Sequence, residues 1–363
     1  MRVLKLPSPW SKNVKNRWFA NRLQFASDGN RLLLEMNGAG GKGADDFRSV
    51  GALAVSTGRW DSVAPADGFF LEMCPPQVWR RDFSCVVMAV SHDGYRCRIH
   101  VANSNELLAD PPLHIERIIA TTQGVVALSA FNFSQDNRWL YIAESWHEGA
   151  YRFGLARADT LALFAKPITE NRRINALTSE QYTHRSTRPE PCKRFATLPK
   201  GIRIFCLGVS PDNRLVAAGA HTGDTYLVSV RGGETLAIFK RKRQKPDKAS
   251  AVHRIAFSPQ GQQLGVVVDG GLRVWDVKTM ELLWEAEDNK AQVLDLAYHP
   301  AGNVIAVARI DGAAVFLDAM TGKVLHRYAW KVGQLNSVAF SPDGLTCAAG
   351  GEKGQVVVWD VDV

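Results

Sequence analysis

A glycine-rich segment, Gly38–Gly43, contains Lys42 and is the part of the sequence closest to a phosphate-binding loop. Small residues let backbone amides approach an anion, which is the basis of such loops. A Walker-type loop also requires Ser or Thr directly after Gly-Lys at the start of a helix, whereas Gly43 and Ala44 follow here. We therefore expect a flexible loop between two strands and no nucleotide site.

The histidines and serines do not form a catalytic or metal-binding pattern. His147 stands next to Glu148 without the second histidine that a helical zinc motif needs. The segment Gly208–Asp212 lacks the second glycine of a nucleophile elbow. Three other histidines fall in turns or strands of the repeat described below, where a hydrogen-bonded structural role is expected: His92, His253 and His299. The sequence predicts no catalytic residue, no metal and no cofactor, so we expect a protein that is not an enzyme.

Basic residues are concentrated in two segments. The segment Lys166–Arg203 has nine basic and three acidic residues, and the segment Lys240–Lys248 has six basic residues and one acidic residue. The whole chain carries a formal net charge of +8, so the remainder is slightly acidic and the basicity is local. Local basic surfaces suit acidic or phosphorylated proteins and the phosphate backbone of nucleic acids.

The composition indicates a soluble globular protein, with 46% hydrophobic and 22% charged residues. No uncharged apolar run reaches the ~18 residues that cross a membrane, and residues 1–7 lack the apolar core of a signal peptide. The six cysteines form no CxxC pair, so we expect free thiols rather than disulfides or a structural zinc site. A cytoplasmic location is the expectation that follows.

A repeat of about 42 residues runs through the chain. Its first marker is a tight turn of the type Phe-Ser-Pro-X-Gly, and its second is Trp-Asp or Leu-Asp. In the C-terminal third the first marker occurs at Phe257–Gly261, Tyr298–Gly302 and Phe340–Gly344, and the second at Trp275-Asp276, Leu317-Asp318 and Trp359-Asp360. Looser copies of the turn lie at Phe25–Gly29, Phe133–Asn137 and Val209–Asn213. With one further unit between about residues 68 and 117, the sequence predicts seven units.

Each unit contains short apolar runs separated by Gly, Asp, Asn and Pro, which is typical of strands in hairpins. In the fifth unit we expect strands at His253–Phe257, Gln263–Val268, Leu272–Asp276 and Glu281–Trp284, with Asp269-Gly270 turning the second into the third. A single four-stranded sheet exposes both faces, so tandem sheets must stack. A closed ring leaves no sheet without a neighbour.

The turns and the Trp-Asp dipeptides resemble the WD40-repeat family of seven-bladed β-propellers over nearly the whole chain. The resemblance implies an all-β fold of seven blades, each with four antiparallel strands a to d, and a scaffold that presents loops to partners rather than an enzyme. One departure is that no Gly-His dipeptide occurs in the sequence. The family's hydrogen-bonded tetrad of that His, a turn Asp, a Ser or Thr and the Trp therefore cannot be complete in any blade.

The two ends of the sequence are expected to meet in one blade. The last unit stops after its third strand, at Trp359-Asp360, and residues 2–6 resemble the outer strands of other units. We therefore expect the N-terminal strand to complete blade seven. Residues 1–363 should form a single domain, with residues 166–200 as an irregular insert between blades three and four.

Both basic segments are expected to connect strand d of one blade to strand a of the next, on either side of blade four. In a propeller of this family those connections share one face with the b-to-c connections, so the two segments should be neighbours. Trp146, expected in the b-to-c connection of blade three, and Trp330, expected in the d-to-a connection before blade seven, should open on the same face. Exposed aromatic residues among basic ones are typical of binding surfaces. The predicted partner-binding residues are Lys240, Arg241, Lys242, Arg243, Lys245, Arg172, Arg173, Arg185, Arg188, Trp146 and Trp330.

Two functions remain open at this point. The first is a protein-interaction scaffold whose basic face binds an acidic or phosphorylated protein. The second is nucleic-acid binding through the same face, and the lack of an RNA-binding motif with interleaved aromatic residues favours the first. A third reading is that the charged segments serve solubility alone. No membrane partner is expected, and the sequence does not determine the oligomeric state.

Overall fold

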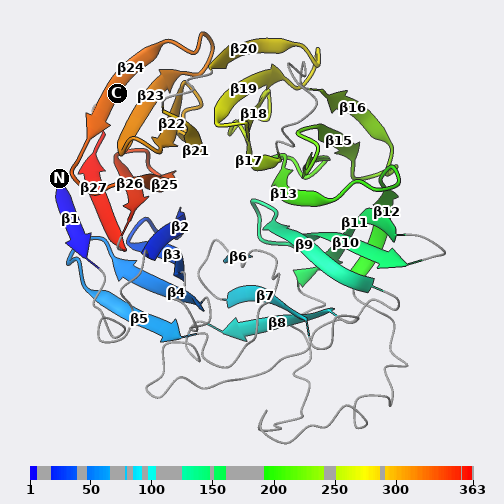
Figure 1. The fold of residues 1–363 in the computed structure, drawn as a ribbon, viewed down its shortest axis with the longest axis horizontal. Helices are drawn as coiled ribbons and strands as arrows, with labels where there is room; N and C mark the ends of the chain where they lie inside the picture. The colour runs from blue at the N-terminus through cyan, green and yellow to red at the C-terminus, as the bar shows by residue number, and fades with distance from the viewer. Residues whose placement is uncertain are drawn as a thin grey trace, which may run out of the picture.

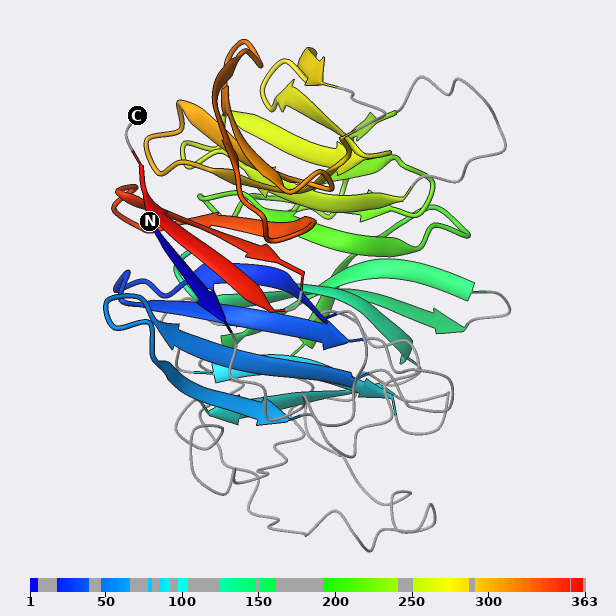
Figure 2. The same ribbon diagram turned by 60° about the vertical axis from the view of Figure 1, so that its left-hand side comes forward.

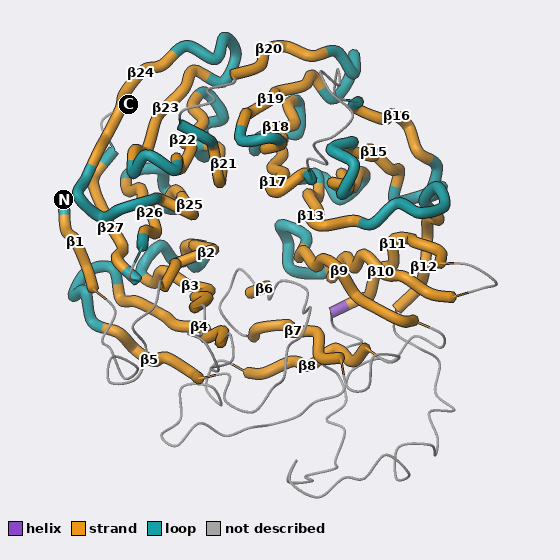
Figure 3. The backbone as a smooth tube through the Cα atoms, in the orientation of Figure 1, coloured by secondary structure: helices purple, strands orange, loops and turns teal. Residues whose placement is uncertain are grey.

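The computed structural model describes residues 1–5, 18–38, 47–65, 78–79, 85–91, 97–103, 125–147, 151–160, 192–240, 251–286, 291–352 and 354–361. Within these ranges the chain forms seven antiparallel sheets, six with four strands and one with three. The sheets stand like blades around a central opening (Figure 1). Strands joined by tight turns make up most of the described chain (Figure 3). The predicted all-β, seven-bladed ring is confirmed.

The blades follow one another in chain order, with strand a nearest the central opening. Blades one to three comprise β2 (Trp18–Phe25), β3 (Arg31–Gly38), β4 (Phe47–Ala54) and β5 (Trp60–Pro65); β6 (Val78–Trp79), β7 (Cys85–Ser91) and β8 (Cys97–Asn103); and β9 (Val125–Phe133), β10 (Trp139–His147), β11 (Tyr151–Asp159) and β12 (Cys192–Thr197). The first strand of blade two, which the sequence did not reveal, is therefore β6.

The C-terminal blades are the most regular. Blades four to six comprise β13 (Ile204–Val209), β14 (Leu215–Ala220), β15 (Thr225–Ser229) and β16 (Thr235–Phe239); β17 (Val252–Phe257), β18 (Gln263–Val268), β19 (Gly271–Asp276) and β20 (Leu282–Ala286); and β21 (Val293–Tyr298), β22 (Val304–Arg309), β23 (Ala313–Asp318) and β24 (Val324–Ala329). Blade seven consists of β25 (Leu335–Phe340), β26 (Thr346–Gly351), β27 (Gln355–Asp360) and β1 (Arg2–Lys5). The strands of blade five agree with the sequence prediction to within two residues.

The core lies in layers between neighbouring blades. Strand β18 is buried along its whole length, since adjacent blades cover both of its faces. Between blades five and six, for example, Val274 and Leu272 pack against Val307 and Val315. The outer strand β24 is mostly exposed. Burial on both faces explains why the inner strands read as continuous apolar runs rather than as alternating patterns.

Blade seven is built from both ends of the described chain. Strand β1 pairs antiparallel with β27, from Arg2 opposite Val358 to Lys5 opposite Gln355. It lies between blade seven and blade one, as Figure 2 shows. Leu4 packs against the core between these two blades, and the Arg2 guanidinium donates to the carbonyl of Ser56. The predicted closure by the N-terminal strand is confirmed.

Part of the segment expected to be an irregular insert between blades three and four is instead a strand of blade three. Its end forms β12 (Cys192–Thr197), which pairs with β11 as the outer strand of blade three. The connection that spans residues 161–191 therefore lies within blade three, between strands c and d. Residues 161–191 fall outside the described chain. The prediction of unbroken irregular chain over 166–200 is wrong at β12.

Each a-to-b turn that the structure describes contains a residue with a left-handed backbone. The φ angle is 73° at Gly261, 82° at Gly302 and 76° at Gly344. Glycine adopts this conformation without steric cost, which explains its place in the repeat marker. Blades three and four have Asn137 (φ 58°) and Asn213 (φ 59°) at the same position. Asparagine tolerates this region better than most residues, so the looser copies of the marker form the same turn.

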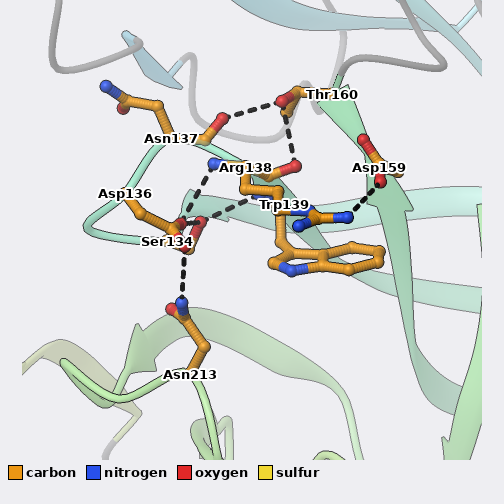
Figure 4. A network of polar contacts seen from close by, with 8 residues as sticks. All are labelled: Ser134, Asp136, Asn137, Arg138, Trp139, Asp159, Thr160 and Asn213. Atoms are coloured by element: carbon orange, nitrogen blue, oxygen red, sulfur yellow. Dashed lines mark hydrogen bonds and ion pairs between the residues drawn. The ribbon is translucent and has the colours of Figure 1, made fainter.

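Polar side chains hold these turns and link them around the ring. The Ser134 hydroxyl lies 2.5 Å from Asp136 Oδ1 and accepts a hydrogen bond from the N–H of Trp139 at 2.9 Å. Asn213 Nδ2, on the next blade, donates to Asp136 Oδ2 at 3.1 Å (Figure 4). Serines Ser210 and Ser341 make the same two contacts in their own turns. The turns thus form a polar belt on the face that we call the a–b face.

Hydrogen bonds join the end of strand β11 to the a-to-b turn of blade three. The Thr160 hydroxyl lies 2.7 Å from the carbonyl of Asn137 and 2.9 Å from that of Arg138 (Figure 4). Arg138 also forms an ion pair with Asp159 at 3.6 Å. The chain therefore leaves β11 toward residues 161–191 from a fixed point on the a–b face.

Aspartates in the turns make the stability of the fold depend on pH. Hydrogen bonds from the Ser341 hydroxyl and the Leu345 N–H hold the pKa of Asp343 below its ordinary value. The N–H groups of Thr279 and Lys278 do the same for the pKa of Asp276. A carboxyl whose pKa is lower in the folded state stabilises the fold above its unfolded pKa of about 3.9, and that contribution disappears as the pH falls further.

We therefore expect the midpoint of urea unfolding to decrease as the pH falls from 5 to about 2.5. The decrease should be shallower in a variant with Asp276→Asn and Asp343→Asn. Asp360→Asn, at an exposed aspartate at the end of β27 and outside these turns, is the control and should leave the slope unchanged. Equal slopes for the double variant and the wild type would contradict the role of these turns.

In blade seven one contact of the family tetrad is missing. Among the described residues, the buried indole N–H of Trp359 has no hydrogen-bond acceptor. In blade six the turn residue Asp311 pairs with Arg309 at 3.4 Å and Arg327 at 3.1 Å. Arginine thus takes the place of histidine as partner of the turn aspartate there.

Candidate binding site at the mouth of the central channel

A β-bulge recurs near the start of the inner strand in six blades. In each of these blades the pairing with strand b skips one residue of strand a that lies five positions before the residue following the strand. In blade three the pairing also skips Val126. A bulge changes the direction in which its side chain points and often lies beside functional sites. The bulged residues are Asn21, Ser129, Phe205, His253, Leu294 and Asn336. We call this ring of residues the mouth.

The mouth lies on the face opposite the polar belt. Inner strands begin on this side, which also carries the d-to-a and b-to-c connections, and we call it the d–a face. Phe205 is 46% exposed and His253 is also exposed, while the other mouth residues are partly buried. Strands β13 and β17 contact each other, so the side chains of Phe205 and His253 belong to neighbouring blades.

His253 contributes a neutral ring at physiological pH. The neighbouring strands partly desolvate the ring of His253 even though its surface is exposed, and this desolvation, followed by the positive charge of Arg254, holds the pKa of His253 below its ordinary value. The neutral imidazole both donates and accepts a hydrogen bond. Together with Phe205 it gives the mouth an aromatic side with hydrogen-bonding capacity, which is typical of protein-binding centres.

A buried charge cluster lies directly beneath the mouth. Arg254 Nε is 3.3 Å from Asp295 Oδ1, and Asp295 Oδ2 accepts a hydrogen bond from the N–H of Val338 at 3.1 Å. Burial raises the pKa of Asp295, an effect that Arg254 opposes. Burial also lowers the pKa of Arg22, with Glu35 and Asp295 acting in the other direction. Two positive groups, Arg22 and Arg254, and two negative groups, Glu35 and Asp295, therefore interact beneath the mouth, and we call this centre of the ring the hub.

Contacts at the hub also link successive blades. Each contact joins an inner strand to the inner strand of the next blade, from blade three round to blade one. The contacts are Asn132 Nδ2 to Leu207 O (2.9 Å), Cys206 Sγ to Val252 O (3.5 Å), Arg254 Nε to Asp295 Oδ1 (3.3 Å), Val338 N to Asp295 Oδ2 (3.1 Å) and Ser337 Oγ to Ala20 O (2.7 Å). The mouth thus rests on a continuous polar framework.

The described residues show no reactive or metal-binding centre. Burial raises the pKa of Cys206 to about 12, so its thiol stays protonated. Cys347 is likewise buried, and both thiols are free. No group of three His, Cys, Asp or Glu side chains in the described ranges is arranged to hold a metal ion. Among the described residues, no helix is long and apolar enough to cross a membrane.

Of the predicted basic residues, the structure describes only Lys240, which is exposed at the end of β16. The others lie outside the described residues: Arg241, Lys242, Arg243, Lys245, Arg172, Arg173, Arg185 and Arg188. The segment after Lys240 leaves blade four on the d–a face. Residues 161–191 leave and re-enter blade three on the a–b face, because they join strands c and d. The prediction that both segments start from the same face is therefore wrong.

Trp146 is not an exposed aromatic residue. It lies within strand β10, and only 9% of its surface is exposed. The Arg194 guanidinium, from outer strand β12, lies 3.5 Å from the centre of the indole ring and also forms an ion pair with buried Glu144. Gly154, on the strand between them, has no side chain to block this approach. The prediction of an exposed ring at Trp146 is wrong because a distant strand folds over it.

Trp330 occupies the predicted connection before blade seven but is partly buried there. Its ring centre is 4.6 Å from that of Trp359 and 6.0 Å from that of Tyr328. Its Nε1 lies 2.8 Å from the Met1 sulfur. These contacts hold the ring against blade seven. Whether Trp330 and Lys240 bind a partner stays a prediction.

The sequence did not point to the mouth residues. Their shared feature is a spacing, five positions before the Ser, Ala or His that follows strand a, rather than a residue type. Recognising them requires the strand pairing, since a bulge is a property of register.

Two family models match the C-terminal part of the chain. The model of the WD domain, G-beta repeat, matches residues 322–360. The model of the Anaphase-promoting complex subunit 4 WD40 domain matches residues 270–335. Both regions fall in the blades where the repeat markers are clearest.

Curated relatives match between about a third and a half of the chain. It is 28% identical to Pre-mRNA-processing factor 19 of Dictyostelium discoideum, over 54% of this chain and 40% of that protein. It is 27% identical to Periodic tryptophan protein 2 homolog of Schizosaccharomyces pombe, over 36% of this chain and 15% of that protein. It is 25% identical to Meiotic recombination protein rec14 of Schizosaccharomyces pombe, over 45% of this chain and 53% of that protein. The chain thus spans about half or less of the length of these relatives. These matches show WD40 repeats in residues 270–360, and together with the seven blades and their turn markers they support the WD40-repeat family for the chain.

Proposed function

We propose that the protein is a non-enzymatic interaction scaffold whose d–a face binds an acidic or phosphorylated protein. The observation that supports this most directly is the mouth, where exposed Phe205 and His253 stand on blades four and five. Exposed Lys200 and Arg203 precede β13, and exposed Lys240 follows β16, so basic residues flank the aromatic side of the mouth. An aromatic anchor beside positive charge suits a partner with acidic or phosphorylated side chains.

A nucleic acid is the second candidate partner. One of the relatives is named as a pre-mRNA-processing factor, and the segment Lys240–Lys248 is rich in arginine and lysine. Phosphate neutralisation by such a segment would give strongly salt-dependent binding. The mouth itself offers only one exposed phenyl ring for base stacking, so the protein partner is the better supported of the two.

The test replaces Lys240, Arg241, Lys242 and Arg243 with Ser. Stability should change by less than about 0.5 kcal/mol, because a run of consecutive charged residues has little apolar area to bury. The matched control removes the same charge from the a–b face, through Arg214→Ser, Arg231→Ser, Lys278→Ser and Lys323→Ser, all at exposed residues. Partners are captured by pull-down with each variant, with and without nuclease. The first variant should lose its partner, and the control should keep it.

Salt titration separates the two partners. For a nucleic acid, the logarithm of the association constant should fall with the logarithm of salt concentration at a slope of about −5, and the slope should be about 3 to 4 units shallower in the first variant. For an acidic protein, salt should slow association more than it speeds dissociation, and generic DNA or RNA should not compete. Equal affinity and salt dependence in wild type and variant would remove this face from the function. The cytoplasmic location stays a prediction that fluorescence imaging can check.

A further inference from the structure

Arg254 makes contacts on both sides of the central channel. From blade five its Nη2 donates to the carbonyl of Asn21 on blade one at 3.1 Å. Blades six and seven separate these two blades on one side of the ring, and blades two to four separate them on the other. Figure 1 shows β17 and β2 on different sides of the central opening. The arginine side chain therefore crosses the channel.

The same guanidinium binds the backbone of the mouth. Its Nη1 donates to the carbonyl of His253 at 3.0 Å, and its Nη2 contacts the carbonyl of Asn21. Both carbonyls belong to bulged mouth residues. Asp295, the ion-pair partner of Arg254, follows bulged Leu294 and accepts from Val338 on blade seven. One ion pair thus contacts the backbone next to the bulges of blades one, five, six and seven.

A buried ion pair is a poor source of net stability. Removing two charges from water costs about as much as their attraction returns, so an apolar pair of similar volume is often tolerated. Removing one partner alone leaves a buried charge without compensation and is strongly destabilising. The pairing of Arg254 with Asp295 at the hub is better explained by geometry, because the planar guanidinium fork binds several acceptors at once.

We infer that Arg254 and Asp295 form a cross-channel brace that fixes the positions of the mouth residues on blades one, five, six and seven. This side of the mouth is then rigid on the d–a face. The inference concerns the free protein and holds whether or not the mouth binds the proposed partner.

Hydrogen exchange followed by mass spectrometry tests the brace without any partner. The variants are Arg254→Met, Asp295→Leu and the double variant, with Arg214→Met as control for loss of an arginine from an exposed ion pair. The double variant should melt at a higher temperature than either single variant. Its amides in residues 19–22, 252–254 and 336–338 should nevertheless exchange about tenfold faster than in the wild type. Exchange in the a–b turns should not change, and the control should match the wild type everywhere.

A further variant keeps the test decisive if Arg254→Met does not fold. Arg254→Lys retains the charge but has no fork to reach two carbonyls, so it should remain folded and lose protection in residues 19–22. Wild-type protection of the mouth in the double variant or in Arg254→Lys would overturn the brace. A failed pull-down would not bear on it, so this inference and the proposed function fail independently.

Discussion

Deletion of residues 1–5 should lower the free energy of unfolding by about 3–5 kcal/mol. The deletion removes the whole of β1, including its pairing with β27 and the packing of Leu4 between blades seven and one. It also leaves an unpaired edge along β27, which favours aggregation. Urea unfolding gives the stability, and light scattering during thermal unfolding gives the aggregation. An unchanged melting temperature would contradict ring closure by β1.

Two point variants separate the contributions within β1. Leu4→Ala removes a partly buried side chain and should cost about 1–2 kcal/mol. Val3→Ala alters a side chain that is 45% exposed and should change stability by less than about 0.5 kcal/mol. Equal effects of the two substitutions would mean that β1 acts through its backbone pairing alone.

Phe316→Ala should destabilise the protein by about 3–5 kcal/mol. Phe316 is fully buried between blades six and seven, and its ring centre lies 5.2 Å from Tyr328 and 5.3 Å from Phe340. Truncation leaves a cavity that these rings cannot fill without moving. Chemical unfolding monitored by tryptophan fluorescence is a direct measurement, because Trp359 lies beside the cavity.

Phe205→Ala is the matched control for that substitution. It removes the same side chain from an exposed position at the mouth, so stability should change by less than about 0.5 kcal/mol. Partner capture should fall, since an exposed aromatic residue at a binding centre is a frequent hot spot. A stable Phe316→Ala variant would contradict the core assignment. An undiminished pull-down with Phe205→Ala would remove Phe205 from the proposed site.

The features that the sequence predicts well are local in the chain. The marker Phe257–Gly261 combines a hydroxyl that binds its own turn with a glycine of positive φ, and both effects act over a few residues. Its regular spacing predicts the number of blades, and burial between blades explains the apolar inner strands. Most of the ring can therefore be predicted from the sequence alone.

The errors arise where distant residues meet. Trp146 looks like a loop residue beside a charged segment, but Arg194 folds over it from β12 and Glu144 is buried with it. Strand β12 itself reads as basic irregular chain, because an outer strand has one unpaired edge and tolerates exposed charges there. The sequence did not predict the mouth residues, because bulges depend on strand register, which residue types do not specify.

The pairing of β1 with β27 also sets an order of events during synthesis on the ribosome. The first strand to emerge cannot find its partner until the last blade has been made, because Arg2 pairs with Val358. Until then blade one lacks the neighbour that buries Ala20 and Leu34, and β1 has an open edge. Contacts of such long sequence separation form late and leave a nascent chain exposed to misassembly. The nascent ring therefore spends the whole of its translation as an open arc, the period in which a chaperone would protect it.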